Sequence, residues 1–485
     1  MELEQAREYI RKAQREFAEW HKRVEVSERY YANDSDIKRT GAAAIDAVNN
    51  YLKELGINPL RSADNRIPTN WHEIMTVQKV AYLFTYPPIF TVGQDDELSK
   101  DVKKVLGDEY KKVMTDLATY ATNGGKAWLQ YWVDTSGKFR MAALRADECV
   151  KFTDPMDISR PMIALVRRYT LEDSLGQQIP HYQVWDKDSV LYLKGGQLEA
   201  EELMIDGEPV TGLPNDFDEI PFIEFCNNDK EQGDLPKYKE LIDMYDKVIS
   251  GFANDLDDIQ EIVWVLKDYT GENEQTISIP QRDEEGNILY DEDGDPRLKQ
   301  VNKPINLLQQ IKAQKYVTVD ENGGLDKLSI EIPHEARDAA LTILQKQIYI
   351  SGMGVDPNPE RTGQATGAYV DHLYSLLELK AGMMQAQFEA ALNKLVRAIL
   401  AHLGRTDDLT IEQTWTRNKP KVDNEIVERL NSTPSTVMSD YTKRRKHPDI
   451  DDPDAEDEFV KKEQEEALQN MMDSFGQPQE VGNEQ

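Results

Sequence analysis

The sequence predicts an α+β fold that is mainly helical. Two observations support this class. Apolar residues recur every three or four positions over several long segments in both halves of the chain, as in amphipathic helices. Between residues 127 and 226 the pattern changes to short segments rich in β-branched and aromatic residues, as in antiparallel strands. At 485 residues the chain is too long for one compact core, so we expect several domains.

Composition narrows the class of protein. Hydrophobic residues make up 39% of the chain, the mean hydropathy is -0.65, and no run of about 18 apolar residues occurs, so we expect no membrane span. The first segment is charged and amphipathic and lacks the apolar centre of a secretory signal. Only Cys149 and Cys226 occur, which indicates a reducing compartment without disulfides, and no Cys or His pair has zinc-ligand spacing.

The net charge of -32 bears on the partners. It argues against a protein that grips nucleic acid, because affinity for phosphates grows with the number of Lys and Arg contacts. It does not exclude a protein past which DNA slides without sticking. The acidity can also serve solubility alone, and composition leaves both interpretations open.

The first part of the chain has helical patterns. We expect helices up to residue 56, with a break at 31–39, and Gly56 is a typical C-cap. Two further helices are expected over 70–84 and 97–120.

Strand-like segments follow, separated by turn residues. They lie at 127–133, 138–144, 148–153, 162–170, 181–186, 189–194 and 221–225. The sequence DTSG at 134–137 predicts a hairpin turn. We expect one antiparallel meander over 127–226.

The most regular helical pattern runs from 237 to 266 as one apolar stripe, roughly 45 Å long at 1.5 Å per residue. Its other faces carry acidic residues, among them Asp243, Asp246 and Asp255. A helix of this length cannot bury its stripe in a small core alone. It must therefore lie against a second long helix or a neighbouring subunit.

An insertion of different character occupies 267–332. It contains a polar hairpin or loop around 282–300 and a strand pair around the Asn-Gly-Gly turn at 322–324. A helix is expected over 335–350, the Gly/Pro-rich segment 352–367 interrupts it, and a longer helix follows over 369–403.

The C-terminal part is less regular. We expect a strand at 411–418 and short helices at 423–431 and 439–445. From residue 449 onward thirteen Asp or Glu stand against two Lys, so we expect this tail to be frayed or disordered unless a partner holds it.

The sequence contains no catalytic motif. Gly125 and Lys126 lack the spacing and the hydroxyl residue of a phosphate-binding loop. His72 and Glu73 begin like a zinc protease motif, but Thr76 stands where the second His is needed. We therefore predict no enzymatic activity and no cofactor.

One acidic run resembles a calcium loop. It comprises Asp291, Asp293 and Asp295, but Pro296 stands where an EF-hand needs Gly, and Asn302 where it needs Glu. A polar turn is favoured over weak cation binding, and we predict no metal site.

The order of these features resembles the portal proteins of tailed bacteriophages. In that family an apolar-Pro strand leads through a short acidic loop to a first long helix, as at 220–260. A strand, a Gly-Gly turn and an apolar-x-x-E-x-P pattern then precede the second helix, as at 317–349. Segments 65–90 and 433–466 also look like that family, and the resemblance covers about residues 10–466.

The resemblance implies a portal fold, mainly helical, with long stem helices, a β-rich wing and a small α/β clip. The parts would be the wing (1–236), stem helix 1 (237–266), clip (267–332), stem helix 2 (333–351), tunnel loop (352–367), long wing helix (368–405), crown (406–448) and acidic tail (449–485).

The resemblance also implies an assembly. The chain would form a homomeric ring, usually of twelve subunits, at one capsid vertex of the virion after assembly in the host cytoplasm. Its partners would be copies of itself, double-stranded DNA in the channel, the terminase large subunit, the head-completion adaptor, and the major capsid and scaffold proteins, with no membrane. Twelve chains of -32 give about -384, and an acidic lining repels DNA over a Debye length of about 8 Å.

Candidate site residues follow from this assignment. The tunnel-loop candidates are Gly354, Asp356, Asn358, Glu360, Arg361, Gly363 and Gln364. Arg361 is the one fixed positive charge in that loop, so we expect it to touch phosphate transiently. Asp243, Asp246 and Asp255 would form the channel face of the stem. The alternative for the tunnel-loop residues is a plain connector between two helices. The alternative for the three Asp residues is an ordinary solvated helix face.

Two other classes stay open. A packaging motor or nuclease would need a phosphate-binding loop or a metal-carboxylate motif, and an ATPase assay separates it from a portal. A scaffold or minor head protein is the other alternative, although scaffolds are mostly simple helices. Light scattering distinguishes it, because a portal ring has about twelve times the 55.6 kDa of one chain.

Overall fold

The structure is a computed structural model that describes most of the chain. The described residues are 1–39, 63–93, 96–205, 208–258, 263–267, 274–281, 288–290, 296–304, 324–328, 334–357, 367–405, 408–419, 423–446, 450 and 453–475. They fall into two units. Unit 1 comprises Met1–Glu28, His72–Lys237 and Tyr349–Gln485, and unit 2 comprises Arg29–Trp71 and Tyr238–Ile348.

The α+β class is confirmed. The helices are α1 (Leu3–Tyr31), η1 (Asp36–Lys38), α3 (Trp71–Phe84), α4 (Asp96–Leu106), α5 (Tyr110–Gly124), η2 (Ala146–Glu148), η3 (Leu235–Lys237), α6 (Lys239–Asp258), α8 (His334–Gly352), α9 (Gly367–His402), α10 (Asp423–Ser432), α11 (Asp440–Lys446) and α12 (Pro453–Phe475). The break expected at 31–39 is present, although α1 includes Tyr31 and η1 forms within the break, and α3, α8 and α9 match the helices expected from the sequence.

The strands are short, as expected. They are β1 (Ile89–Val92), β2 (Lys126–Val133), β3 (Phe139–Arg145), β4 (Cys149–Thr153), β5 (Met162–Glu172), β6 (Gln178–Trp185), β7 (Ser189–Lys194), β8 (Glu199–Ala200), β9 (Leu203–Ile205), β10 (Glu208–Val210), β11 (Gly212–Pro214), β12 (Phe222–Cys226), β13 (Val263–Lys267), β14 (Glu274–Pro280), β15 (Leu298–Pro304), β16 (Gly324–Leu328) and β17 (Ile411–Thr414).

The expected helix over 97–120 is two helices. Gly107 ends α4 with a φ of +66°, and α5 begins three residues later. Glycine adopts this left-handed conformation without the steric cost of a Cβ. The apolar stripe continues across the break because both helices pack on the same core.

The expected single meander is divided in unit 1 into two larger antiparallel sheets and the separate pair β9-β10. One has the strand order β12-β2-β3, and the other has the order β11-β7-β6-β5-β4, with β8 beside β7. The hairpin between β2 and β3 forms at DTSG, where the Asp134 carboxylate accepts hydrogen bonds from the amides of Ser136 and Lys138. The three residues of η2 carry the chain from β3 into the second sheet.

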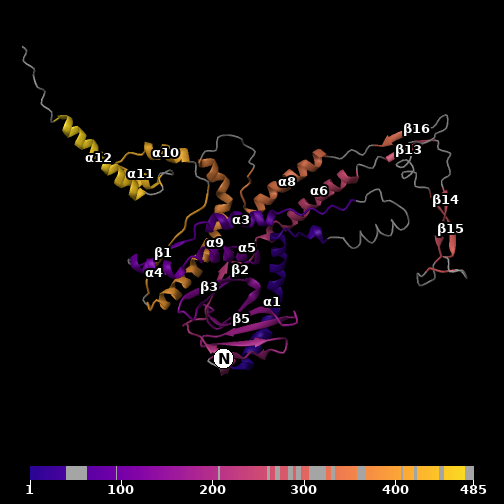
Figure 1. Ribbon diagram of the computed structural model, residues 1–485, viewed down its shortest axis with the longest axis horizontal. Helices are drawn as coiled ribbons and strands as arrows, with labels where there is room; N and C mark the ends of the chain where they lie inside the picture. Colours follow the sequence, from indigo (N-terminus) through magenta and orange to yellow (C-terminus); the bar gives the residue numbers. More distant parts are fainter. Residues whose placement is uncertain are drawn as a thin grey trace, which may run out of the picture. The chain divides into compact units, whose positions relative to one another are not determined.

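Unit 1 is built in layers. Alternate residues of β2 face opposite sides, as strand geometry requires. Ala127, Leu129 and Tyr131 lie in the large core cluster with α3, α4, α5 and α9, whereas Trp128 packs with residues of the second sheet. The other face of the second sheet is covered by α1, which contributes Ala6, Ile10, Ala13 and Phe17 (Figure 1).

Unit 2 contains α6 and α8, which lie side by side (Figure 1). Arg337 of α8 forms an ion pair with Asp255 of α6, and its guanidinium stacks 5.7 Å from the centre of the Phe252 ring. The expectation of a second long helix beside the first is met within the described part of this unit.

The expected helix 237–266 is shorter than predicted. α6 spans 20 residues, roughly 30 Å, and Val263–Lys267 forms strand β13, which pairs with β16. Three of these residues, Val263, Trp264 and Val265, are of the β-branched or aromatic kind that favours strands. The strand expected beside the Asn-Gly-Gly turn, at 315–319, lies outside the described residues.

The polar hairpin of the insertion is confirmed. β14 pairs with β15 over Glu274–Pro280 and Leu298–Pro304, and Tyr290 forms an isolated bridge with Pro296. The acidic run 291–295 lies outside the described residues, as does the helix expected over 41–56.

The C-terminal part of unit 1 contains β17, which pairs with β1, and the helices α10, α11 and α12. The expectation of a frayed or disordered tail is wrong for Pro453–Phe475, which is helical. The segment is rich in helix-forming residues, Asp457 pairs with Lys461 one turn later, and Arg444 of α11 also binds Asp457. None of the described helices has the combination of length and apolar character that a bilayer-spanning helix needs.

Candidate functional site

The region where α8 ends contains a polar site of unit 1. The helix ends at Gly352, and Met353 has a φ of +51°. The Met353 amide donates to the Ile350 carbonyl over 3.1 Å, and the Gly354 amide donates to the Tyr349 carbonyl over 2.9 Å. This pair of bonds is the Schellman pattern, which satisfies the last carbonyls of a helix.

The chain after α8 is held on α3. The Gln78 side chain donates to the Val355 carbonyl over 2.8 Å and accepts from the Val355 amide over 3.0 Å. Gly354 lies directly over α3, and a Cβ at that position would lie 2.5 Å from the Met75 sulfur. The first residues of the 352–367 segment therefore have a fixed place.

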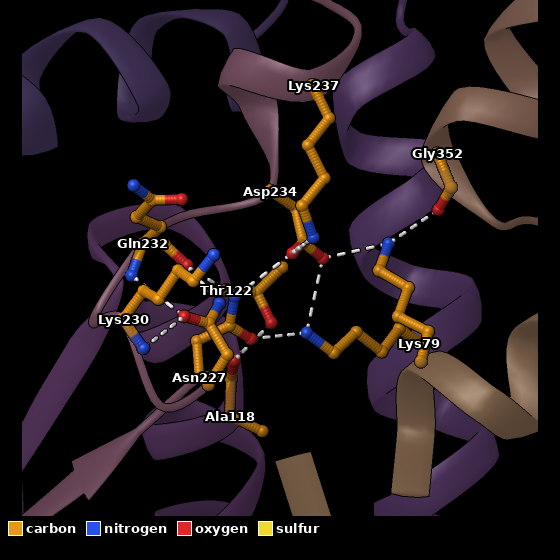
Figure 2. Close-up of polar contacts among 11 residues, drawn as sticks. Lys79, Ala118, Thr122, Asn227, Lys230, Gln232, Asp234, Lys237 and Gly352 are labelled. Atoms are coloured by element: carbon orange, nitrogen blue, oxygen red, sulfur yellow. Dashed lines mark hydrogen bonds and ion pairs between the residues drawn. The ribbon is translucent and has the colours of Figure 1, made fainter. Parts of the chain in front are cut away.

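A buried ionic cluster lies next to this point, and we call it the Asp234 cluster. It consists of Lys79 of α3, Asn227 and Asp234 of the segment after β12, and Lys380 of α9. The Asp234 carboxylate is 3.1 Å from the Lys79 ammonium and 2.8 Å from the Lys380 ammonium. Figure 2 shows Lys79 and Asn227 directed at Asp234.

The cluster also reaches the end of α8. The Lys380 ammonium donates to the Gly352 carbonyl over 2.8 Å. The carbonyl end of a helix carries a partial negative charge, so a cation is favourable there. Through Lys380, one carboxylate connects α3, α9 and the end of α8.

The side chains of Lys79, Asp234 and Lys380 are 1%, 1% and 3% exposed, so their charges are almost fully removed from water. Burial would raise the pKa of Asp234, but the charges of Lys380 and Lys79 outweigh it and hold the pKa well below its ordinary value. Burial lowers the pKa of Lys79 to about 8, although Asp234 opposes the change. Lys237, less buried, approaches Asp234 to 3.5 Å.

His72 lies in the same interior. It is fully buried, and burial lowers the pKa of its imidazole to about 4, with the nearby Asp234 opposing the shift. It is therefore neutral at pH 7. A neutral ring adds no further positive charge beside the two lysines.

This cluster was not predicted from the sequence, although a signal for it was present. Lys79 stands four residues after Met75 and four before Leu83, both buried on α3. Lys380 stands between the buried residues Leu377 and Met384 of α9. A lysine on an apolar stripe indicates a buried partner, because an unpaired charge is rarely buried. The partner, Asp234, follows an irregular loop and has no such pattern.

The tunnel-loop candidates are only partly described. Gly354 lies against α3, and Asp356 follows Val355, which packs against the large core cluster. Asn358, Glu360, Arg361, Gly363 and Gln364 lie outside the described residues. Their expected role at the channel stays a prediction.

Two of the acidic stem candidates have partners within unit 2. Asp243 accepts a hydrogen bond from the Tyr30 hydroxyl and lies 2.8 Å from the Lys239 ammonium. Asp255 pairs with Arg337. Both are partly exposed, and their position at a channel stays a prediction.

Asp246 requires a correction. Its side chain is fully buried and accepts hydrogen bonds from Ser35 and from both the amide and the hydroxyl of Thr69. Burial raises the pKa of this carboxyl, and these hydrogen bonds offset the effect only in part. A buried acceptor of this kind anchors α6 to the segment before α3, so Asp246 presents no exposed face.

Glu224, Cys226 and Glu231 come close enough together to suggest a metal site. The two carboxylates form ion pairs with lysines instead. The Lys126 ammonium lies 3.1 Å from the Glu224 carboxylate and 2.9 Å from that of Glu231, and Lys151 also pairs with Glu224. Burial raises the pKa of the Cys226 thiol to about 12, whereas metal ligation needs the thiolate. This group is an ion-pair network that joins β2, β4, β12 and the loop after β12.

Comparison with known proteins gives consistent results. The family model described as "Phage portal protein, SPP1 Gp6-like" matches residues 10–470. A portal protein of Clostridium phage phiCD119 is 33% identical over 502 aligned positions, which cover 98% of this chain and 99% of that protein. The portal protein of Bacillus phage SPP1 is 26% identical, with coverage of 92% of this chain and 85% of that protein.

A solved structure of the neck of a native GTA particle is similar at 13% identity, covering 82% of this chain and 92% of that chain, with a TM-score of 0.37. This likeness is too distant to support an argument. The family match and the relative at 33% identity each extend over nearly the whole sequence. The chain therefore belongs to the SPP1 Gp6-like family of phage portal proteins.

Proposed function

We propose that this chain forms a ring of about twelve copies at one capsid vertex and that double-stranded DNA passes through the ring during packaging and ejection. Membership of the portal family is the observation that carries the proposal. The net charge of -32 per chain supports it, because an acidic wall keeps phosphates from sticking.

The helices of unit 2 also favour assembly. α6 and α8 pair with each other, yet Met244, Leu256 and Ile343 remain 52%, 49% and 67% exposed. Apolar side chains at successive levels of two long helices gain stability when a neighbouring copy covers them. This pattern supports α6 and α8 as the stem.

Within this function, residues 267–332 serve as the clip, the docking face for the terminase large subunit and later for the head-completion adaptor. The segment 352–367 serves as the tunnel loop, and Arg361 contacts phosphate transiently. Asp243 and Asp255 line the stem channel. Hydrolysis of ATP then belongs to the terminase, and this chain is a structural component of the virion.

The ring is tested on purified protein by light scattering and particle imaging. We expect a species of about twelve times 55.6 kDa with a central hole. A stable monomer under every assembly condition, with no affinity for phage heads, would contradict the proposal. A scaffold-like assembly without a hole would favour the alternative of another capsid component.

The loop is tested by Arg361→Glu in phage particles, with Arg361→Lys as the matched control. We expect Arg361→Glu to reduce DNA retention and packaging, because a repulsive charge replaces the attractive one, and Arg361→Lys to behave as wild type. Unaltered packaging in Arg361→Glu would refute the phosphate contact.

A further inference from the structure

The contact between Gln78 and Val355 fixes the main chain at the start of the loop. One side-chain amide both donates to the Val355 carbonyl, over 2.8 Å, and accepts from the Val355 amide, over 3.0 Å. Two bonds to the same residue define its orientation as well as its position, as in the pairing of two strands. Because both bonds go to backbone atoms, they do not depend on the side chain at 355.

The neighbouring residues remove the remaining freedom. The space above Gly354 is closed by Met75 and by Gln78 itself, whose oxygen would lie 2.9 Å from a Cβ at 354. Val355 packs against the large core cluster. The main chain is therefore held on three sides between the end of α8 and Asp356.

The α3 side of the contact is equally fixed. Gln78 directly precedes Lys79, whose ammonium is held in the Asp234 cluster. Lys380 of the same cluster binds the Gly352 carbonyl. A shift of α3 along its axis would break the contact with Val355 and the ion pair of Lys79 together.

We propose that Gln78 is a positioning residue that sets where and in which direction the tunnel loop leaves the wing. The inference rests on the proposed function of residues 352–367 as that loop. Only a primary amide meets the requirement, because a Glu at 78 keeps the acceptor for the Val355 amide but repels the Val355 carbonyl, and an Ala keeps neither bond.

The first test measures hydrogen exchange of the peptide covering 353–357 in the assembled protein. Gln78→Ala removes the acceptor of the Val355 amide, so we expect exchange in this peptide to become about five-fold faster, the equivalent of one neutral hydrogen bond. Gln78→Glu should fall between Gln78→Ala and wild type. Val77→Ala, at the adjacent and 47% exposed position of α3, is the matched control and should leave exchange unchanged.

A second variant approaches the contact from the loop. Gly354→Ala places a Cβ against Met75 and Gln78, so it should also speed exchange at 353–357. In the Gln78→Ala background the added effect should be smaller, because one of the two obstructing side chains is already gone. Effects that simply add would mean that the two residues do not interact, which counts against the inference.

The second test measures DNA retained per phage head. We expect Gln78→Ala to assemble rings of normal size and to retain less DNA than the Val77→Ala control, with Gln78→Glu between them. Unchanged exchange at 353–357, or exchange that rises equally throughout α3 and β2, overturns the positioning role.

The outcome for packaging separates this inference from the proposed function. Normal retention in Gln78→Ala together with a defect in Arg361→Glu overturns the inference alone. Normal retention in both variants overturns the proposed role of the loop itself.

Discussion

Removal of the one carboxylate in the Asp234 cluster is the sharpest perturbation of this fold. Asp234→Asn keeps the size of the side chain but leaves Lys79 and Lys380 without a counter-charge in an interior where each is at most 3% exposed. Loss of one partner of a buried ion pair costs roughly 3–5 kcal/mol, because the remaining charge is uncompensated.

The chemistry of lysine sets a limit to this cost. A buried ammonium can give up its proton, which for an ordinary lysine at pH 7 costs roughly 4.6 kcal/mol. Lys79 gives up its proton first, since burial already lowers its pKa to about 8. We therefore expect Asp234→Asn to lower the free energy of unfolding of unit 1 by roughly 3–5 kcal/mol at pH 7.

The pH dependence of this loss is diagnostic. In the variant Lys79 is already neutral at pH 7, whereas in the wild type it becomes neutral above pH 8. A neutral Lys79 is no longer stabilised by the charge of Asp234. The free energies of unfolding of the variant and the wild type should therefore differ by about 1.4 kcal/mol less at pH 9 than at pH 7. This is the value of one pKa unit, which separates pH 7 from the pKa of Lys79.

The assay is urea unfolding followed by circular dichroism at pH 7 and pH 9. Asp229→Asn, an exposed carboxylate five residues away, is the matched control and should change stability by less than about 0.5 kcal/mol. If Asp234→Asn were no more destabilising than this control, or if the gap did not narrow at pH 9, the account of a buried unpaired ammonium would be refuted.

Two further predictions concern other groups. His72 is neutral in the folded chain, with a pKa of about 4, but binds a proton below pH 6.5 when unfolded, so the folded state loses stability as pH falls from 6.5 to 4. Between pH 7 and pH 5 the wild type should lose about 2 kcal/mol more than His72→Gln in urea unfolding, and equal losses would contradict the buried neutral ring. In unit 2, Asp255→Asn removes the partner of Arg337 in an ion pair that is partly exposed. We therefore expect the pairing of α6 with α8 to lose about 1 kcal/mol of stability, measured as faster hydrogen exchange in α8. Exchange in α8 that matched the wild type would show that the pair contributes nothing.

The sequence predicted best where one periodicity runs unbroken. α3 and α9 lie where the helical spacing placed them, because their apolar stripes face the large core cluster of unit 1. α8 also matches its expected range, although its residues Ile343 and Ile350 are exposed. The strands from β2 to β7 were likewise recognisable from composition and turns. Which strand pairs with which was not, because pairing joins residues far apart and depends on turn geometry that composition does not reveal.

The end of α6 shows how two patterns can coincide. Val263 and Leu266 continue the helical stripe of the preceding residues, yet they belong to β13. A short apolar run is compatible with the helical spacing of three or four residues and with the strand spacing of two. Here the segment is a strand, which pairs with β16. The residue types at 263–265 were the better guide.

The polar site could not be predicted in the same way. Lys79 and Lys380 break their apolar stripes visibly, so their burial was open to inference. Asp234 was not, because it lies in an irregular segment among many acidic residues that are exposed. The turn after α8 was also unpredictable, because the left-handed position is occupied by Met353 rather than by an adjacent glycine.

The return of β12 to β2 determines how this part of the chain can fold. β2 and β3 are joined by a tight hairpin, but β12 reaches β2 only after the whole second sheet has been traversed, from residue 146 to residue 221. The entropy of closing so long a segment falls if the inserted sheet has already become compact and brings its two ends together. A nascent chain released before residue 226 would have its central strand open along one side, exposed to mispairing with other chains. Fragments cut within this stretch are therefore poor choices for separate expression, whereas a cut that keeps 126–226 whole preserves the strand order.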